Sequence, residues 1–343
     1  MKINLTVLYN FPLHYREPIF LKIDNYFNVN WFFGDKLHDI RMMDIQKLNS
    51  AMIFKTYHIF GSRFTYTKGV INKKTCFDKN LLVFGDLNSI STLFVLLIRK
   101  CLLKKSVVWS HGAYGNEPSF IINIKKIYFS LASLVLTYNE RSSALLKQWG
   151  CKKETQPIYN SLGSIVNSKI IASKNYKECN LLYLGRITDI KCLNILCDAY
   201  YALKKSYPFI NLKIVGDTLP GSKKVKFKTI SAVYDENEIK DLFEWATVTV
   251  SPGNIGLLAL NSIRHGTPII SHSNWENQMP EFEILEEGVT GFTFEEGNSG
   301  SLSNIIKSNF ILSEFKINKS FFKQYNEKWN TENQLKILKN IFK

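Results

Sequence analysis

The segment around Gly185 carries the residue types that bind a diphosphate. An apolar run over 181–184 ends in Gly185 and Arg186, and Lys191 follows five residues later, where an amphipathic pattern begins. The run is typical of a buried strand and the pattern is typical of a helix. Two cations at the end of a strand can neutralise a diphosphate. Gly185, Arg186 and Lys191 are therefore candidate phosphate-binding residues, and a solvated loop with the same spacing is the alternative.

A second candidate site follows the apolar run 247–250. Small and polar residues come next, and a helical pattern begins after them. The first turn of a helix offers free N–H groups and the positive end of its dipole to a phosphate. The residues that would form this site are Gly253, Asn254, Ile255, Gly256 and Leu257. The alternative is an ordinary capped helix that packs on the sheet.

His111 is the candidate functional residue of the first half. It follows a strand-like run over 106–109, and Gly112 gives the backbone room to turn beside it. A histidine at the end of a strand can orient a ligand hydroxyl by a hydrogen bond. A lone histidine with a structural role is the alternative.

These residues need strands that end beside one another. Strand-like runs alternate with helical patterns along the whole chain, which predicts an α/β protein with two doubly wound, Rossmann-like domains facing each other across a cleft. The predicted strands are 3–9, 29–33, 81–84, 106–109, 134–138, 180–184, 212–215, a short one near 233, 247–250 and 267–271. The predicted boundaries are a domain over 1–164, a polar linker over 165–179, a domain over 180–319 and a lysine-rich amphipathic helix over 320–343 that packs back on the first domain.

Composition excludes several classes of protein. The 343 residues are 45% hydrophobic and 21% charged, which rules out a disordered or low-complexity chain. The longest apolar run, 93–98, is far below the roughly 20 residues of a membrane-spanning helix, and no signal peptide is expected. The six cysteines include no C-x-x-C pair, so neither a zinc site nor a disulfide framework is expected.

The net charge of +15 is concentrated in the first half. Residues 1–160 hold 22 basic and 10 acidic side chains, and the remainder holds 22 and 19. This excess predicts an anionic partner for the first half. Arg99, Lys100, Lys104, Lys105, Lys125 and Lys126 lie in or beside the apolar stretches 93–103 and 121–132. Cations beside exposed apolar residues suit an anionic membrane surface, whereas a solvated face is the alternative.

The ordered set of segments resembles the C-terminal domain of the retaining nucleotide-sugar glycosyltransferases of family 4, which have the GT-B fold. The matching pieces are Arg186 and Lys191, then 234–239, 251–262, 266–270, and Glu281 before Gly288 and Gly291. In the first half, only the strand rhythm and Ser110-His111-Gly112 match. The resemblance is to a variant branch with the sequence S-P-G-N-x-G-L, found among capsule and O-antigen transferases.

The chain departs from the family pattern at two places. Gly253 and Asn261 stand where the family usually has two glutamates, the second of which commonly holds the nucleotide ribose. Asn261 can still form hydrogen bonds there, and Glu281 or Glu283 is a candidate compensating carboxylate. The glycine-rich loop that many members have after the first strand is replaced by 10–17, in which His14 and Arg16 are acceptor-side candidates.

The resemblance implies a retaining transfer of a hexose-type sugar from a nucleotide-diphosphate sugar, with uridine donors ranked ahead of guanosine donors. His111, Arg186 and Lys191 would be the catalytic residues, and the first and second domains would bind acceptor and donor. The implied setting is synthesis of bacterial O-antigen, capsule or lipopolysaccharide on an undecaprenyl-diphosphate-linked acceptor, at the inner face of the cytoplasmic membrane. No cofactor and no metal are expected, because no Asp-x-Asp pattern stands beside the phosphate-binding residues.

Three alternatives stay open. A nucleic-acid or polyanion-binding protein fits the charge, but no zinc, helix-turn-helix or RNP-like sequence is present, so no nucleic acid is expected. A sugar-nucleotide epimerase of the same fold would turn over the donor without an acceptor. A non-catalytic homologue fits the loss of the two glutamates.

Overall fold

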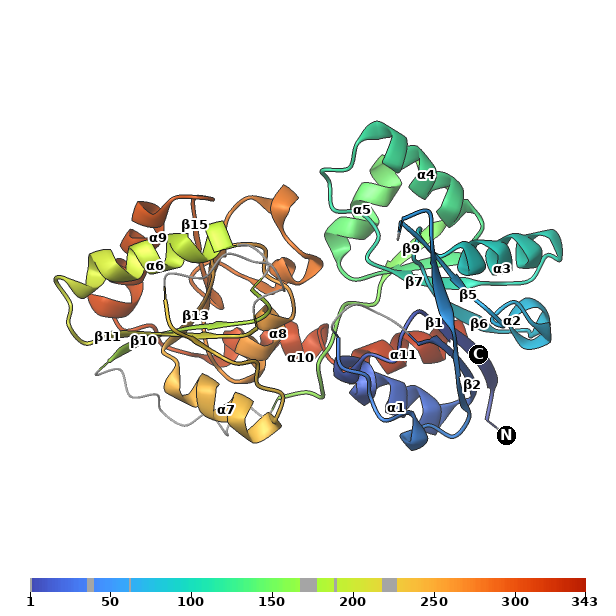
Figure 1. The fold of residues 1–343 in the computed structure, drawn as a ribbon, viewed down its shortest axis with the longest axis horizontal. Helices are drawn as coiled ribbons and strands as arrows, with labels where there is room; N and C mark the ends of the chain where they lie inside the picture. Colours follow the sequence, from blue (N-terminus) through green and yellow to red (C-terminus); the bar gives the residue numbers. More distant parts are fainter. Residues whose placement is uncertain (1, 36–39, 62, 167–177, 188–189, 218–226) are drawn as a thin grey trace. The chain divides into compact units, whose positions relative to one another are not determined.

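Two parallel α/β units form the protein, which we describe from a computed structural model (Figure 1). The structure describes residues 2–35, 40–61, 63–166, 178–187, 190–217 and 227–343. Unit 1 consists of residues 1–165 and 328–343, and unit 2 of residues 166–327. Most of the predicted linker, 167–177, lies outside the described residues. The predicted class, α/β with two doubly wound parallel sheets, is confirmed.

Unit 1 is built on a seven-stranded parallel sheet in the order β3-β2-β1-β6-β7-β8-β9. The strands are β1 Asn4–Tyr9, β2 Asn28–Gly34, β3 Ala51–Phe54, β6 Leu81–Phe84, β7 Val107–Ser110, β8 Leu134–Thr137 and β9 Glu154–Pro157, and a separate hairpin pairs β4 Thr56–Ile59 with β5 Phe64–Thr67. The helices are α1 Glu17–Tyr26, α2 Lys73–Phe77, α3 Ile90–Cys101, α4 Ser119–Ser130, α5 Glu140–Gln148 and α11 Thr331–Ile341. β2 and β3 lie on one side of β1, and β6 to β9 lie on the other. The strand order therefore reverses between β1 and β6, whose carboxyl ends lie next to each other.

Both faces of this sheet are buried, which is why its strands are nearly continuous apolar runs. Trp31 and Phe33 point to the face that α1 and α11 cover, and Phe32 between them points to the opposite face. That opposite face packs against α3, α4 and α5 through side chains such as Val95 and Phe129. The strands therefore leave room for functional groups only at their ends.

Unit 2 repeats the arrangement with a six-stranded parallel sheet in the order β12-β11-β10-β13-β14-β15. Its strands are β10 Cys179–Leu184, β11 Ile210–Val215, β12 Thr229–Ile230, β13 Val248–Ser251, β14 Ile269–His272 and β15 Gly291–Phe294. Its helices are α6 Ile190–Lys204, α7 Glu236–Trp245, α8 Leu257–Arg264, α9 Ser299–Ile306 and α10 Lys323–Glu327. Figure 1 shows α6 and α9 on one face of the sheet and α7 on the other. The strand order reverses between β10 and β13.

The predicted single helix over 320–343 is wrong. The chain forms a short 3-10 helix (Lys319–Phe322), then α10, and then α11. Asn330 interrupts the pattern because its backbone is extended and its side chain accepts a hydrogen bond from the N–H of Asn333, which caps α11. Only α11 packs in unit 1, where Ile337 and Leu338 join the core against α1.

The last helix is also fixed to unit 1 by polar contacts. Gln334 is fully buried, and its side-chain amide donates to the carbonyl of Tyr159 at 2.6 Å. Its amide oxygen accepts from the Ser161 hydroxyl at 2.6 Å. Tyr159 has a φ of 61°, a left-handed conformation that is rare for a bulky residue, so these contacts hold a strained segment in place.

Two of the six cations predicted to face a membrane are instead buried structural residues. The Arg99 guanidinium is fully buried and donates to the Ser106 hydroxyl at 2.9 Å and to carbonyls of Thr75, Asp78 and Lys105. It holds the ends of α2 and α3 against the start of β7. Lys125 is buried as well, on the inner side of α4. A sequence pattern cannot distinguish these cations from exposed ones, because their partners come from distant segments.

We predict that Arg99→Met lowers the free energy of unfolding by about 2–4 kcal/mol, because it leaves buried carbonyls without a donor. The control is Lys100→Met at the exposed neighbouring position, which should change stability by less than about 0.5 kcal/mol. Denaturant unfolding of the two variants checks this. Equal effects would contradict the structural role of Arg99.

Candidate functional site

In unit 2, the predicted phosphate-binding residues lie at the carboxyl ends of β10 and β13, where the strand order reverses. Gly185 and Arg186 follow β10 directly, and the side chain of Arg186 is exposed. The Tyr183 hydroxyl donates to the Arg186 carbonyl at 3.0 Å and fixes the backbone of the turn. Lys191 lies in the first turn of α6. Residues 188–189 between them lie outside the described residues.

The close approach of β11 explains the shape of this turn. Gly216, at the end of β11, has a φ of 152°, and a Cβ there would lie 1.9 Å from the Gly185 carbonyl oxygen. Only glycine fits such a contact. The backbone of Gly185 is thus fixed by its neighbour, and Arg186 starts from a defined position.

The loop between β13 and α8 presents the start of a helix without a side-chain cap. Gly256 is the N-cap residue and has no side chain to cap the first turn, which begins at Leu257. The helix therefore keeps N–H groups that an anion can use. Ile255 differs, because it is fully buried and its N–H already donates to the Gln278 side chain at 2.8 Å. Asn254 is exposed at the tip of the loop.

Gln278 holds this loop, and sequence analysis did not identify it. It is buried, and its amide nitrogen donates to the Ser271 hydroxyl at 3.0 Å and to the His272 carbonyl at 2.9 Å. It therefore ties the end of β14 to the β13–α8 loop. Nothing in the sequence near Gln278 separates it from a surface glutamine, since its partners come from two other segments.

The two departures from the family pattern lie close to this loop. A Cβ on Gly253 would contact the Cys192 sulfur at 3.3 Å, so the first turn of α6 fills the space beside Gly253. Asn261 is half-buried on α8. Glu281 is buried, with 4% of its surface exposed, in a 3-10 helix (Pro280–Ile284) that packs against α8. Glu283 is half-buried in the same turn.

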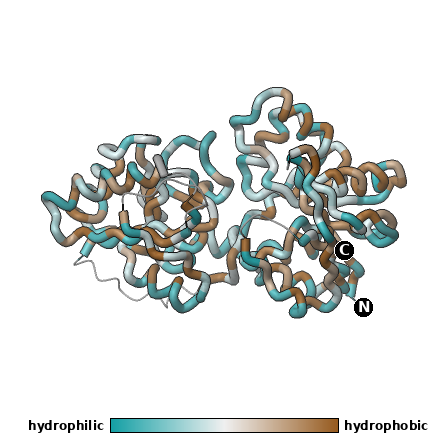
Figure 2. Tube along the Cα trace, in the orientation of Figure 1, coloured by the Kyte–Doolittle hydropathy of each residue, from teal (hydrophilic) through white to brown (hydrophobic). Residues whose placement is uncertain are grey.

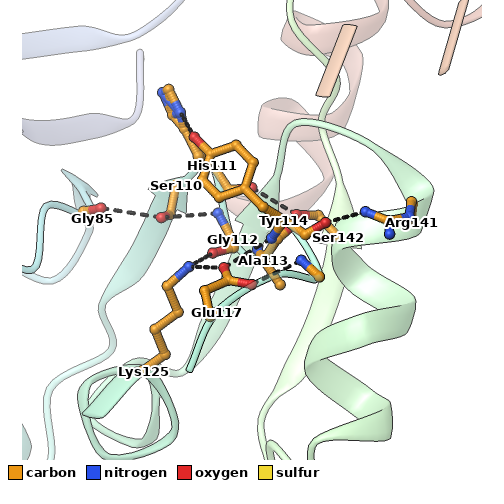
Figure 3. A network of polar contacts seen from close by, with 11 residues as sticks. Gly85, Ser110, His111, Gly112, Ala113, Tyr114, Glu117, Lys125, Arg141 and Ser142 are labelled. Atoms are coloured by element: carbon orange, nitrogen blue, oxygen red, sulfur yellow. Dashed lines mark hydrogen bonds and ion pairs between the residues drawn. The ribbon is translucent and has the colours of Figure 1, made fainter. Parts of the chain in front are cut away.

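In unit 1, His111 follows β7 and begins a tightly bonded loop (Figure 3). The Ser110 hydroxyl donates to the Gly85 carbonyl at 3.1 Å and accepts the N–H of Gly112 at 3.2 Å. Gly112 has a φ of 76°, and a Cβ there would lie 2.8 Å from the Ser142 hydroxyl. That hydroxyl donates to the His111 carbonyl at 2.7 Å. The backbone of His111 is therefore fixed from both sides.

A buried ion pair completes the loop. The Lys125 ammonium donates to a Glu117 carboxylate oxygen at 2.5 Å and to the Gly112 carbonyl at 2.7 Å. The same carboxylate accepts the N–H groups of Tyr114 and Gly115 at 2.9 and 2.8 Å. Burial alone would raise the pKa of Glu117, but these hydrogen bonds outweigh it and hold the pKa below its usual range. Lys125 thus serves the His111 loop and not a membrane.

The surroundings of His111 keep its imidazole neutral. Burial, and then the charges of Arg16 and Lys125, lower its pKa to about 3. The ring packs against Tyr138, with centroids 4.4 Å apart, and its Nδ1 lies 3.4 Å from the Tyr114 hydroxyl. At neutral pH, His111 can therefore accept or donate a hydrogen bond, but it holds no proton to give as an imidazolium.

The structure brings Arg16 to this cluster and leaves His14 outside it. The Arg16 guanidinium is buried and lies over the rings of Trp109 and Tyr138, 5.0 and 4.9 Å from their centroids. The half-buried ring of His14 instead pairs its Nδ1 with the Arg41 carbonyl at 3.1 Å, and burial lowers its pKa. Over the described part of the chain, no group of three or more His, Cys, Asp or Glu side chains could hold a metal ion.

We predict that Glu117→Gln lowers the thermal midpoint of unit 1 by about 6–12 °C. Removing one member of a buried ion pair costs about 3 kcal/mol, and each kcal/mol shifts a domain of this size by about 2–4 °C. Because the pKa of Glu117 is lowered in the folded protein, its stabilisation is present above the usual glutamate pKa of about 4.3 and is lost as the pH falls through the lower value. Scanning calorimetry at pH 7 and below pH 4 measures both effects.

The control is Glu154→Gln, which removes an exposed carboxylate from the same unit. It should leave the midpoint nearly unchanged. If Glu117→Gln behaves in the same way at pH 7, the ion pair does not hold the loop.

Comparison with known proteins gives this geometry a context. Residues 178–308 match the family described as "Glycosyl transferases group 1". An uncharacterized glycosyltransferase of Haemophilus influenzae is 23% identical over 276 residues, which are 74% of this chain and 73% of that protein.

Solved structures share the whole fold at low sequence identity. A glycosyltransferase from Rickettsia africae has a TM-score of 0.68 at 14% identity and covers 99% of this chain and 98% of its own. The lipopolysaccharide outer core galactosyltransferase WaaB, in its apo form, has a TM-score of 0.66 at 14% identity, with 98% of each chain covered. The protein is thus a glycosyltransferase with a group 1 domain over residues 178–308 and a GT-B-like fold.

Proposed function

We propose that the protein moves a hexose-type sugar, with retention of configuration, from a nucleotide-diphosphate sugar bound by unit 2 to a saccharide acceptor bound by unit 1. The observation that carries the proposal is the end of the unit 2 sheet, where Arg186, the first turn of α6 with Lys191, and the uncapped start of α8 adjoin the reversal of strand order. Ligands of open α/β sheets bind at such positions. A diphosphate is the ligand that these groups match.

The chemistry follows from the leaving group. The sugar–phosphate bond breaks through an oxocarbenium-like state, and the acceptor oxygen attacks the same face while its hydroxyl proton passes to the departing phosphate oxygen. Arg186, Lys191 and the N–H groups of Gly256 and Leu257 stabilise the developing negative charge on the diphosphate. Neutral His111 orients the donor sugar or the acceptor hydroxyl by a hydrogen bond. No step of this scheme requires a metal ion or a cofactor.

The two positions that depart from the family pattern, 253 and 261, suggest which groups hold the donor. A Cβ at 253 would lie 3.3 Å from the Cys192 sulfur, so a longer side chain there requires Cys192 to move by a few tenths of an ångström. With glycine at 253, the backbone of Gly253 and Asn254 would face the sugar. Asn261 would bond the ribose hydroxyls through its amide. Buried Glu281 beside α8 would supply the carboxylate that position 253 lacks. Uridine is the base we rank first.

The acceptor is proposed to be linked to undecaprenyl diphosphate, in the synthesis of lipopolysaccharide, O-antigen or capsule. The similarity in fold to a lipopolysaccharide core galactosyltransferase supports this setting. So does the surface of α4, where Phe120 and Ile127 are 58% and 68% exposed and Ile124 lies on the same side, with Lys126 beside them. Figure 2 shows that much of α3 and α4 is hydrophobic. Within the described residues, no helix combines the length and the apolar character needed to cross a bilayer.

The alternative functions predict different ligand binding and different turnover at the same site. A sugar-nucleotide epimerase would bind the donor and convert it without any acceptor. A non-catalytic homologue would bind the nucleotide and release no product. A polyanion-binding protein would bind oligonucleotides in a strongly salt-dependent way and ignore nucleoside diphosphates.

We predict that saturating UDP, without metal, raises the thermal midpoint of the protein by about 5–11 °C, and that Arg186→Ala abolishes the rise. A ligand at about 100 times its dissociation constant adds about 2.7 kcal/mol, and each kcal/mol is worth about 2–4 °C. GDP and ADP are measured in parallel, with an oligonucleotide as a further ligand.

The matched control is Arg264→Ala at the opposite end of α8, where Arg264 pairs with Glu236 on the surface. It should retain the full response to UDP. No response to any nucleotide, together with a salt-sensitive response to the oligonucleotide, would contradict the proposal.

We also predict that the protein cosediments with vesicles containing phosphatidylglycerol and that the double variant Ile124→Gln and Ile127→Gln weakens this binding at least tenfold. Burying each isoleucine in the interface is worth about 1.5–3 kcal/mol. Ile230→Gln, an exposed apolar position in unit 2, is the control and should bind normally. Equal binding to neutral phosphatidylcholine vesicles, or an unaffected double variant, would contradict membrane docking by α4.

A further inference from the structure

Unit 1 contains a pocket that neither the family pattern nor the His111 loop accounts for. It lies at the carboxyl ends of β1 and β6, where the strand order reverses, and its volume is about 40 Å³. Its polar lining residues include Asn10, Thr56, Thr67, Asp86, Ser89 and Thr92. That volume holds about three water molecules, or one hydroxymethyl-sized group.

The pocket presents hydrogen-bond acceptors. In the described part of the chain, the Asp86 carboxylate accepts one hydrogen bond, from the N–H of Asn88 at 2.9 Å. The side-chain oxygen of Asn10 is buried and has no hydrogen-bond partner among the described residues. Burial raises the pKa of Asp86, as expected for a carboxylate that has lost water and gained few donors. Both groups need a donor from a ligand or from water.

The hydroxyls around these acceptors are already engaged with one another. The Thr56 and Thr67 hydroxyls lie 3.1 Å apart, and those of Ser89 and Thr92 lie 2.8 Å apart. Each pair can still accept or donate one further hydrogen bond. Among the described residues that line the pocket there is no lysine or arginine. In a chain with a net charge of +15, the described part of this lining carries one negative group and no positive one.

The shape of the pocket is fixed by close backbone packing. A Cβ on Gly34 would lie 2.6 Å from the Asn10 carbonyl and 2.6 Å from the Thr56 hydroxyl. β1, β2 and the hairpin therefore approach as closely as a glycine allows. A site defined this tightly selects small polar groups by size.

The pocket is also connected to His111 within unit 1. Tyr9 lines it, and the Tyr9 hydroxyl lies 3.5 Å from that of Tyr138. Tyr138 in turn packs against the His111 ring, with 4.4 Å between the ring centroids. The pocket is thus linked through Tyr9 and Tyr138 to the residue proposed to orient the reacting groups.

We propose that this pocket is a binding site for one hydroxyl-bearing group of a neutral saccharide, with Asp86 and Asn10 accepting hydrogen bonds from sugar hydroxyls. A hydroxyl donates one hydrogen bond and accepts another, which matches acceptors surrounded by threonine and serine hydroxyls. An anionic group would meet the Asp86 carboxylate, and the described lining residues offer no cation to compensate. The inference rests on the proposed function, because it takes this sugar to be part of the acceptor. It adds that the part of the acceptor that enters the pocket carries no charge.

The test is saturation-transfer NMR on the full chain with methyl α- and β-glycosides of glucose and galactose, in the absence of donor. We expect at least one glycoside to bind, and we expect Asp86→Asn to weaken its binding at least tenfold. Thr92→Val, which removes a hydroxyl at nearly constant volume, should weaken it by a smaller factor and serves if Asp86→Asn does not fold. Asp44→Asn, at an exposed carboxylate of the same unit, should bind as the unaltered protein does.

The outcomes separate this site from the donor site. Loss of glycoside binding in Asp86→Asn, with the UDP response intact, supports the pocket. Absence of binding by all four glycosides, or binding that Asp86→Asn and Thr92→Val leave unchanged, overturns it and leaves a water-filled cavity. A protein that binds a glycoside through Asp86 but binds no nucleotide would keep the pocket and refute the proposed transfer.

Discussion

Parallel strands that are buried on both faces can carry functional groups only where they end. In unit 1, Trp31, Phe32 and Phe33 point alternately into two cores, so no position along that strand is free for chemistry. Several candidate groups of the protein accordingly lie at or just after the carboxyl end of a strand, including Arg186 after β10 and His111 after β7. The reversal of strand order then decides which ends have open space between them.

In unit 1, the ends of the strands are held in place by charged side chains that are themselves buried. Lys125 and Glu117 lie under the His111 loop and bond its carbonyl and N–H groups, and Arg99 does the same where β7 begins. Burying an ion is unfavourable unless all its hydrogen bonds are made, and each of these side chains has several. The net charge of the first half is therefore partly structural, and only the remaining lysines are available to an outside partner.

The sequence alone was sufficient to predict the strands and helices whose residue pattern lies within the element itself. The strand predicted over 3–9 is found at 4–9, and the one predicted over 106–109 is found at 107–110, because apolar runs bounded by turn residues locate strands directly. The short strand predicted near 233 lies at 229–230, where it is an edge strand of two residues with little apolar character. For the candidate sites, Gly185, Arg186, Lys191, Gly256 and His111 could be placed at strand or helix ends. Gln278, Glu117 and Asp86 could not be recognised, since each acquires its surroundings from segments far away in the chain.

The position of α11 has a consequence for how the protein is made. Ile337, Leu338 and Phe342 belong to the core that covers one face of the first sheet, and Gln334 bonds the segment around Tyr159. A ribosome delivers these residues only after all of unit 2 has been synthesised. Until then, part of the unit 1 core is open to solvent, so the first unit to be translated is the last to be finished. Unit 2 consists of one continuous stretch, so it can fold while the chain is still growing.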